Sequence, residues 1–148
     1  MAADPSSLGI EGVELPEIAW LRQPALPFGV RLVRATQLVA VVVLRGEVDI
    51  HSASRFRDVV AAGIEGGVRA VVVDLSAVSF IDGAGLGVIV LTARRLGPGA
   101  VALVLPHRGL VRVFRICGLD RLLAICETRE EALRGLLEQG STVPTGLP

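Results

Sequence analysis

Short apolar runs alternate with segments of helical periodicity along this chain, and this alternation limits the fold more than any other feature. Residues 70–75 are apolar except for Asp74, and residues 101–105 are wholly apolar. Such runs are typical of strands buried on both faces of a sheet. Between them, residues 83–96 have the length and apolar spacing of a helix. The pattern predicts an α/β domain with a small, mixed and mostly parallel β-sheet on which helices pack.

The complete pattern predicts five strands and four helices. We expect strands at residues 30–35, 38–44, 70–75, 101–105 and 122–125, and helices at 52–64, 83–96, 110–117 and 128–139. Thr128 and Glu131 have the spacing of a capping box at the start of the last helix. Val72, Ile89 and Phe114 are predicted to be buried between the sheet and its helices, because each belongs to an apolar run.

The chain of 148 residues has the length of one domain. Residues 28–139 are predicted to form it. Residues 1–27 hold four acidic residues, four prolines and the single basic residue Arg22, which predicts a flexible acidic arm. Its Trp20 is a candidate anchor if the arm is a docking segment rather than a disordered leader. Residues 140–148 are predicted to be a disordered tail.

Charge and hydropathy exclude several classes of protein. The 15 basic residues balance 15 acidic ones, whereas a general nucleic-acid binder needs a basic excess. The longest uncharged stretch has 12 residues, too few to span a membrane. The first residues lack the pattern of a signal peptide, so a cytoplasmic protein is expected. Cys117 and Cys126 are expected to be small buried residues in a reducing compartment, not a disulfide or a metal site.

Catalytic and cofactor motifs are poorly represented. His51 and His107 are the only histidines, and no Ser or Cys lies in a nucleophile-elbow pattern. Glycines at 83, 85 and 87 do not fit the dinucleotide fingerprint, because seven residues separate them from the strand and no acidic residue follows at the required distance. The glycines fit close helix packing and a tight loop better. We therefore expect no enzyme activity, no cofactor and no metal.

Two loops follow predicted strands at the edge where α/β sheets meet their ligands and partners, residues 46–54 and 76–85. In the second loop, Asp82 stands directly before a helix, which predicts a helix N-cap. In the first loop, Asp49, His51 and Ser52 are expected to form a polar turn and an N-cap rather than a catalytic triad.

Three stretches resemble the STAS domain, the fold of bacterial anti-sigma factor antagonists. They are LRGEVD at 44–49 with Ser52 and Ala53, VDLS at 73–76 with VSFID at 78–82 and GLG at 85–87, and RVF at 112–114 with Gly118 and Leu119. The resemblance spans residues 30–138. It implies a partner-switching protein that binds an anti-sigma factor of the serine-kinase type and so releases a sigma factor for transcription.

The resemblance also implies a phosphorylation switch that this chain lacks. In the family, the kinase phosphorylates a serine in the motif D-S-[ST]-G, and the added negative charge disrupts docking. Here Asp82 is followed by Gly83 and Ala84, which carry no hydroxyl group. Position 83 therefore cannot accept phosphate. Ser79 is the nearest hydroxyl and the candidate substitute.

The expected activity is therefore binding by surface complementarity, with the partner an anti-sigma factor of the serine-kinase type. The predicted partner-binding residues are Asp49, His51, Ser52, Asp82, Gly83, Ala84, Gly85, Arg94 and Arg95. Two other functions remain open: a STAS subunit of a lipid or anion transport complex, and a nucleotide-binding STAS module. A homodimer also remains open.

Overall fold

The computed structural model describes residues 27–105 and 107–142, which form one five-stranded sheet with helices on both faces. The strands are β1 (Gly29–Arg34), β2 (Val39–Val48), β3 (Ala70–Ile81), β4 (Val101–Val104) and β5 (Ala124–Cys126). They lie in the order of the sequence, β1-β2-β3-β4-β5. β1 pairs antiparallel with β2, and all the other pairs are parallel. The predicted mixed, mostly parallel sheet is therefore confirmed.

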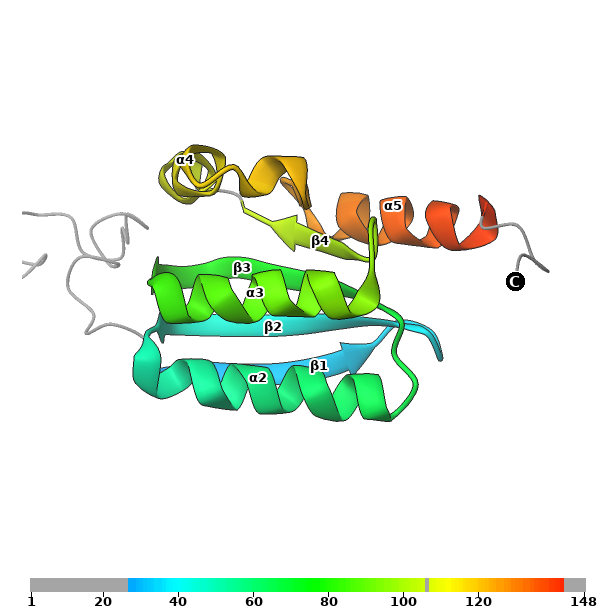
Figure 1. The fold of residues 1–148 in the computed structure, drawn as a ribbon, viewed down its shortest axis with the longest axis horizontal. Coiled ribbons are helices and arrows are strands. Elements are labelled where there is room, and N and C mark those ends of the chain that lie inside the picture. Colours follow the sequence, from blue (N-terminus) through cyan, green and yellow to red (C-terminus); the bar gives the residue numbers. More distant parts are fainter. Residues whose placement is uncertain (1–26, 106, 143–148) are drawn as a thin grey trace, which may run out of the picture.

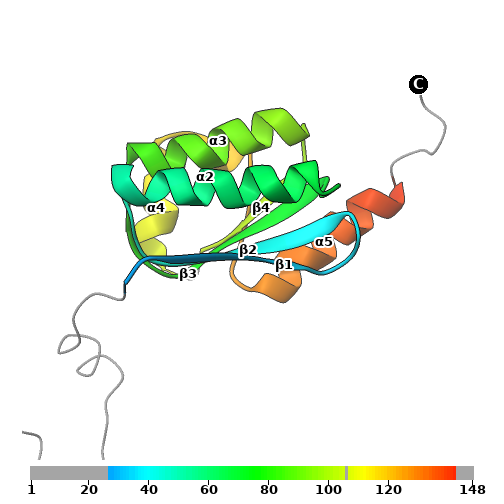
Figure 2. The same ribbon diagram turned by 90° about the horizontal axis from the view of Figure 1, so that it is seen from below.

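The four predicted helices are also present. They are α2 (Ile50–Glu65), α3 (Gly83–Leu96), α4 (Arg108–Ile116) and α5 (Arg129–Thr142). Figures 1 and 2 show α2 and α3 side by side on one face of the sheet and α5 on the other face. No helix among residues 27–105 and 107–142 is long and apolar enough to cross a membrane.

The core lies in two layers, one on each face of the sheet. The larger layer packs α2, α3 and α4 on the sheet and contains Ile89 and Phe114, both fully buried. The smaller layer packs α5 on the sheet and contains Val72, also fully buried, with Ala132 and Leu136. The predicted burial of Val72, Ile89 and Phe114 is confirmed.

Strands β2 and β3 are longer than their apolar runs predict. β3 continues through residues 76–81, so most of the segment predicted as a loop is strand. Its pairing with β2 continues beyond two register shifts, one between Val43 and Arg45 and one between Gly46 and Glu47. Such bulges break the two-residue period of burial. Val78 and Ile81 are both buried although they lie three residues apart, which hides the strand in the sequence.

Several smaller predictions need correction. A 3₁₀ turn at Leu119–Arg121 precedes β5, which starts two residues later than expected. Cys117 is exposed rather than buried, because it lies just beyond α4, whose one buried side chain is Phe114. Cys126 is only half-buried, and both cysteines are free thiols. The predicted arm lies outside the described residues except for Pro27, and α5 continues to Thr142, into the segment predicted as a tail.

The start of α5 resembles the predicted capping box but differs in one bond. Thr128 Oγ1 accepts a hydrogen bond from the Glu131 backbone N–H at 3.1 Å, as expected. The Glu131 carboxylate, however, accepts from the N–H of Glu127 at 3.3 Å, one residue before the cap. The bond from the Glu131 carboxylate therefore reaches the residue before the cap, whereas in a capping box it reaches the cap residue itself.

A buried ion pair fixes α5 to the sheet. Asp74, in the middle of β3, is 4% exposed, and its Oδ2 accepts hydrogen bonds from Arg129 Nη2 at 2.7 Å and Nε at 3.0 Å. Its Oδ1 accepts from the Ser76 N–H and hydroxyl. Burial alone would raise the pKa of Asp74, but the hydrogen bonds from Ser76 and Arg129 outweigh it and lower the pKa below its ordinary value.

Candidate protein-interaction site

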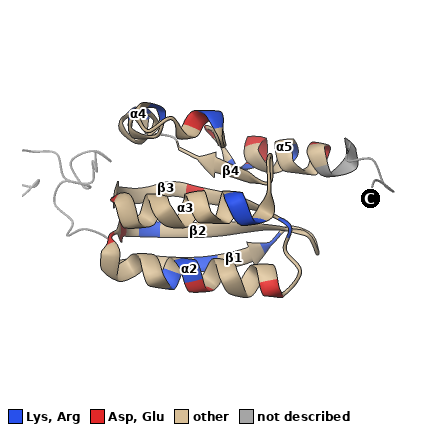
Figure 3. Cartoon of the chain, viewed as in Figure 1, with Lys and Arg blue, Asp and Glu red and all other residues tan. Residues whose placement is uncertain are grey.

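The two predicted loop regions meet at one edge of the sheet. β2 and β3 run parallel and end side by side, with Val48 opposite Ile81. Asp49 and Asp82 follow these residues directly and begin α2 and α3. Figure 1 shows both helices starting at this edge, which we call the acidic edge. In Figure 3 the backbone is red, the colour of acidic residues, at the starts of the two helices.

Asp82 caps α3, as predicted. Its Oδ1 accepts hydrogen bonds from the backbone N–H groups of Ala84 at 2.9 Å and Gly85 at 3.3 Å. Its own N–H donates to the carbonyl of Val48 at 3.0 Å, which ties the start of α3 to the end of β2. The carboxylate of Asp82 is therefore committed to holding the helix start.

Asp49 and Ser52 form the predicted N-cap of α2, in the form of a capping box. Asp49 Oδ1 accepts from the N–H groups of His51 and Ser52 at 2.9 and 3.0 Å, and Ser52 Oγ accepts from the Asp49 N–H at 2.8 Å. The hydroxyl of buried Ser52 also donates to the Glu47 carbonyl at 2.9 Å. The Ser52 N–H contributes most to lowering the pKa of Asp49, against desolvation that would raise it. Ser52 is thus a structural residue, and exposed His51 is the member of this group that faces solvent.

The glycines of the second loop differ from one another. A Cβ atom on Gly85 would lie 2.7 Å from both Ile81 Cγ1 and Val48 Cγ1, so α3 approaches the strand ends too closely for a side chain there. Gly83 is exposed, a Cβ on it would meet no atom within 4 Å, and its φ is not positive. Gly87 is equally unobstructed. Close packing therefore explains Gly85, but it does not explain Gly83 or Gly87.

The candidate substitute acceptor Ser79 lies on β3 rather than in a loop. Ser79 is exposed, and its Oγ lies 3.5 Å from the carbonyl oxygen of Gly46 on the neighbouring strand. The Ser76 hydroxyl instead donates to Asp74. Ser79 is therefore the exposed hydroxyl nearest in sequence to Asp82.

Arg94 and Arg95 are not at the acidic edge. They occupy the last turn of α3, where cations complement the helix dipole. With a rise of ~1.5 Å per residue, the helix places them ~18 Å from Gly83. Figure 3 shows this basic end of α3 opposite the acidic helix starts. The structure thus brings together the other predicted residues, from Asp49 to Ser52 and from Asp82 to Gly85, and separates these two arginines from them.

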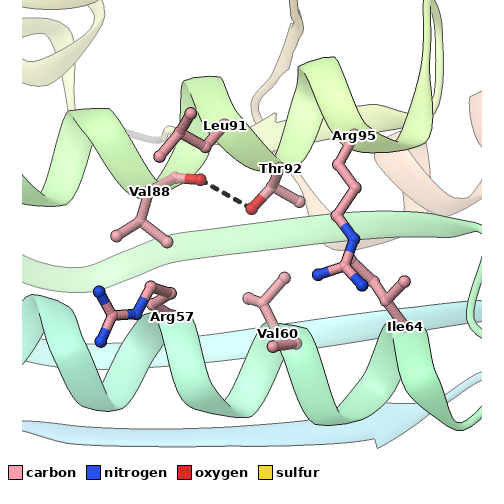
Figure 4. Close-up of a pocket in the computed structure, with 8 residues that line it drawn as sticks. Arg57, Val60, Ile64, Val88, Leu91, Thr92 and Arg95 are labelled. Carbon is pink, nitrogen blue, oxygen red and sulfur yellow. Dashed lines mark hydrogen bonds between the residues drawn. The ribbon is translucent and has the colours of Figure 1, made fainter.

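Arg95 instead lines a groove between α2 and α3 of about 210 Å³. Figure 4 shows its side chain above Ile64, with Val60 and Val88 forming the apolar floor and Leu91 on the upper rim. Thr92 does not offer its hydroxyl to a ligand, because it donates to the Val88 carbonyl at 2.7 Å. No local sequence pattern predicts this groove, because it arises only when two helices that are separate in the sequence pack together.

Exposed apolar side chains at the acidic edge were also missed. Ile50, the first residue of α2, is 71% exposed, and Phe80, next to the end of β3, is 48% exposed. Ile50 directly follows the capping residue Asp49, at the first helical position, which points away from the core. An apolar residue at this position was the sequence signal that could have indicated an exposed side chain. Large apolar side chains beside exposed polar ones are typical of surfaces that contact other proteins.

The described residues hold no group of three or more His, Cys, Asp or Glu side chains that could bind a metal ion. His107 is the N-cap residue of α4 rather than of α2 or α3, and its Nε2 lies 3.2 Å from the Ser76 carbonyl oxygen. The carboxylates of Asp49 and Asp82 are both engaged by backbone N–H groups. The acidic edge is therefore an exposed surface built on two helix starts.

Comparisons with known proteins agree with this fold. The family model described as the STAS domain matches residues 31–132. The anti-sigma-F factor antagonist RsfB of Mycobacterium tuberculosis is 31% identical over 100 residues, which cover 66% of this chain and 81% of RsfB. The crystal structure of an anti-sigma factor antagonist from Mycobacterium paratuberculosis has a TM-score of 0.65 and 26% identity, covering 75% of this chain and 95% of that chain. The unphosphorylated form of the anti-sigma factor antagonist SpoIIAA shares the fold at a TM-score of 0.59 and 21% identity, covering 78% of this chain and all of that one. The chain belongs to the STAS domain family.

Proposed function

We propose that this chain is an anti-sigma factor antagonist-like regulator that acts in the cytoplasm and binds an anti-sigma factor of the serine-kinase type. The observation that carries the proposal is the start of α3, where capped Asp82 is followed by the exposed, unobstructed Gly83. The names of relatives such as RsfB support the partner class. The described surface supports binding rather than catalysis.

The contact surface of this proposal is the acidic edge. It presents exposed Ile50, His51 and Gly83 beside the apolar ring of Phe80. The capped starts of α2 and α3 hold this surface in place, so little conformational entropy is lost on docking. Arg95 and the groove between α2 and α3 extend the surface along the helices.

The proposed protein lacks the usual phosphorylation switch of its family. Gly83 and Ala84 have no oxygen that could accept a phosphoryl group. Without the phosphate, about −1.5 to −2 charges are never added at the acidic edge. The antagonist then stays competent to bind, and its effect follows its amount unless Ser79 serves as a substitute acceptor.

The substitution Gly83→Ser tests this account of the switch. Its matched control is Gly87→Ser, one helical turn further along α3, because both glycines leave room for a side chain. We expect the family kinase with ATP to phosphorylate Gly83→Ser but neither the wild type nor Gly87→Ser, as measured by mass spectrometry. Stoichiometric phosphate on Ser79, Ser76 or Ser52 of the wild type would show that the switch has moved rather than vanished.

Calorimetry with the anti-sigma factor tests the contact surface. Gly83→Asp adds a carboxylate beside Asp82 and should weaken binding about tenfold or more, corresponding to about 1.4 kcal/mol or more. Gly87→Asp is the control, and it should bind more tightly than Gly83→Asp. Equal affinity of wild type and Gly83→Asp would place the interface elsewhere. No binding by the wild type to any kinase-type anti-sigma factor of its host would reject the function itself.

A further inference from the structure

The sheet is covered unevenly on the face that carries α5. α5 packs on β3, β4 and β5. Figure 2 shows α5 on one side of the sheet and α2 and α3 together on the other. Sheets with parallel strands are usually covered on both faces. Beyond α5, β1 and the second half of β2 have no helix over this face in the part of the chain that the structure describes, whereas Val39 and Val41 in the first half of β2 are buried in the α5 layer.

Apolar and basic side chains share this uncovered region. Arg31 stands opposite Val43, and Val33 opposite Val41, so these pairs point to one face. That face is the α5 face, because Val41 and Val43 pack in the α5 layer. Leu32, the β1 residue between the two paired positions, points the other way and packs in the α2 layer.

Phe80 and Arg45 extend the region toward the strand ends. Phe80 pairs with Glu47, next to the inward-facing pair of Val48 and Ile81, so the ring points to the α5 face. Arg45 is paired with Gly29 of β1, and its side chain lies over Gly29 on this same face. We call the group formed by Arg31, Val33, Val43, Arg45 and Phe80 the open face. Val33 and Phe80 are 47% and 48% exposed.

The arginines of the open face have no carboxylate partner in the part of the chain that the structure describes. Two ion pairs lie elsewhere in the domain, and they join Arg57 to Asp58 and Arg129 to Asp74. Arg31 and Arg45 thus present positive charge beside exposed apolar side chains, and the exposed Glu47, which pairs with Phe80 on the same face, offsets only part of it. An occupant that matches this surface carries both carboxylates and large apolar groups.

Residues 1–26 have that composition. They contain four acidic residues and one arginine, together with Trp20 and several aliphatic residues. We propose that this segment, which we call the acidic arm, packs on the open face of its own chain, with its carboxylates near Arg31 and Arg45 and its apolar side chains on Val33 and Phe80. This proposal does not rest on the partner proposed above, although both surfaces include Phe80.

The connection between the arm and the sheet favours an intramolecular contact. β1 begins at Gly29, which is paired with Arg45, so the arm joins the domain beside an arginine of the open face. Only Pro27 and Phe28 separate the arm from the strand. Twenty-six residues can span up to ~85 Å when extended, far more than the open face requires. The arm is also held at high effective concentration by this short connection.

Trp20 offers a direct test, because it is the only tryptophan and the chain has no tyrosine. Its fluorescence should be blue-shifted and protected from acrylamide in the full chain, relative to the same protein unfolded in urea. Val33→Asp should shift the emission toward that of the unfolded chain, because it places a carboxylate against the apolar side chains of the arm. Arg45→Glu should act in the same direction and should make the emission less sensitive to salt.

Matched controls separate docking from general loss of structure. Leu91→Asp changes an apolar side chain that is 62% exposed on α3, and Arg112→Glu changes an exposed arginine on α4. Both should leave Trp20 emission unchanged, while circular dichroism shows that all four variants are folded.

Three results would overturn the proposal. The first is wild-type Trp20 emission equal to that of the unfolded chain. The second is protection of Trp20 that increases with protein concentration, which would make a second copy the occupant. The third is protection that survives both Val33→Asp and Arg45→Glu in folded protein, which would place the arm elsewhere.

Discussion

Removing the Arg129 guanidinium should destabilise the domain by weakening the attachment of α5 to β3. Arg129 donates two hydrogen bonds to Asp74 Oδ2, at 2.7 and 3.0 Å, across 55 positions of sequence. Arg129→Ala leaves Asp74, a residue that is 4% exposed in the wild type, with only Ser76 as a hydrogen-bonding partner. The variant therefore tests how much a buried charge depends on this one cation.

The expected magnitude follows from the burial of the two partners. Breaking a buried pair typically costs about 3–5 kcal/mol, because it leaves a buried charge uncompensated. Here the side chain of Arg129 is 44% exposed, and Ser76 still satisfies Asp74 Oδ1. The loss should therefore resemble that of charged hydrogen bonds, about 1.5–3 kcal/mol.

Urea unfolding at neutral pH measures this loss. Arg134→Ala is the matched control, because Arg134 is an exposed arginine on the same helix and forms no ion pair within the described ranges. It should change the free energy of unfolding by less than about 0.5 kcal/mol. If Arg129→Ala were as stable as Arg134→Ala, the ion pair would not hold α5 in solution and the reasoning would be wrong.

The same pair predicts a pH dependence. The folded pKa of Asp74 is below its ordinary value, because the bonds from Ser76 and Arg129 outweigh burial. The contribution of Asp74 to stability is then complete above the unfolded pKa of about 3.9. It is lost as the pH falls through the folded pKa. Asp74→Asn should flatten the acid limb of the stability curve below about pH 4, and an unchanged acid limb would contradict this assignment.

Four further substitutions test the core and the acidic edge. Phe114→Ala removes a fully buried ring and should cost about 3–5 kcal/mol in urea unfolding; a loss under about 1 kcal/mol would mean that the ring is exposed in solution. Gly85→Ala forces a methyl group against Ile81 and Val48 and should cost about 1–3 kcal/mol, whereas Gly83→Ala should be neutral or slightly stabilising. Asp82→Ala removes the cap of α3 and should cost about 0.5–2 kcal/mol; no change in thermal stability would show that the cap is dispensable.

The strands could be predicted from the sequence where both faces of the strand are buried, because such strands form continuous apolar runs. Residues 70–75 and 101–104 are parallel neighbours, as their composition indicates. The second half of β3 could not be predicted, because it continues through Ser76 and Ser79 and its inward-facing residues fall out of the two-residue period. The register shifts that cause this depend on pairing with β2, which is a tertiary property.

Local parts of the candidate site could be predicted, and long-range parts could not. Asp82 and Asp49 cap their helices because a carboxylate before a helix start needs only the next few residues. The contact between Asp74 and Arg129 was missed, since nothing nearby in the sequence pairs them. The groove beside Arg95 was missed for the same reason, since α2 and α3 must pack before it exists.

In the loop around Asp82, the residues that the fold requires differ from the residue that a kinase would require. Asp82 caps α3, and Gly85 allows the helix to approach the strand ends, so both residues have complete structural reasons to be present. Gly83 lies between them in open space, and the fold places no demand on a side chain there. A hydroxyl at position 83 would therefore serve regulation and not stability. In the regulator proposed above, the absence of this hydroxyl removes the phosphate switch without altering the helix start, and Gly83→Ser is therefore expected to restore the switch in an otherwise unchanged protein.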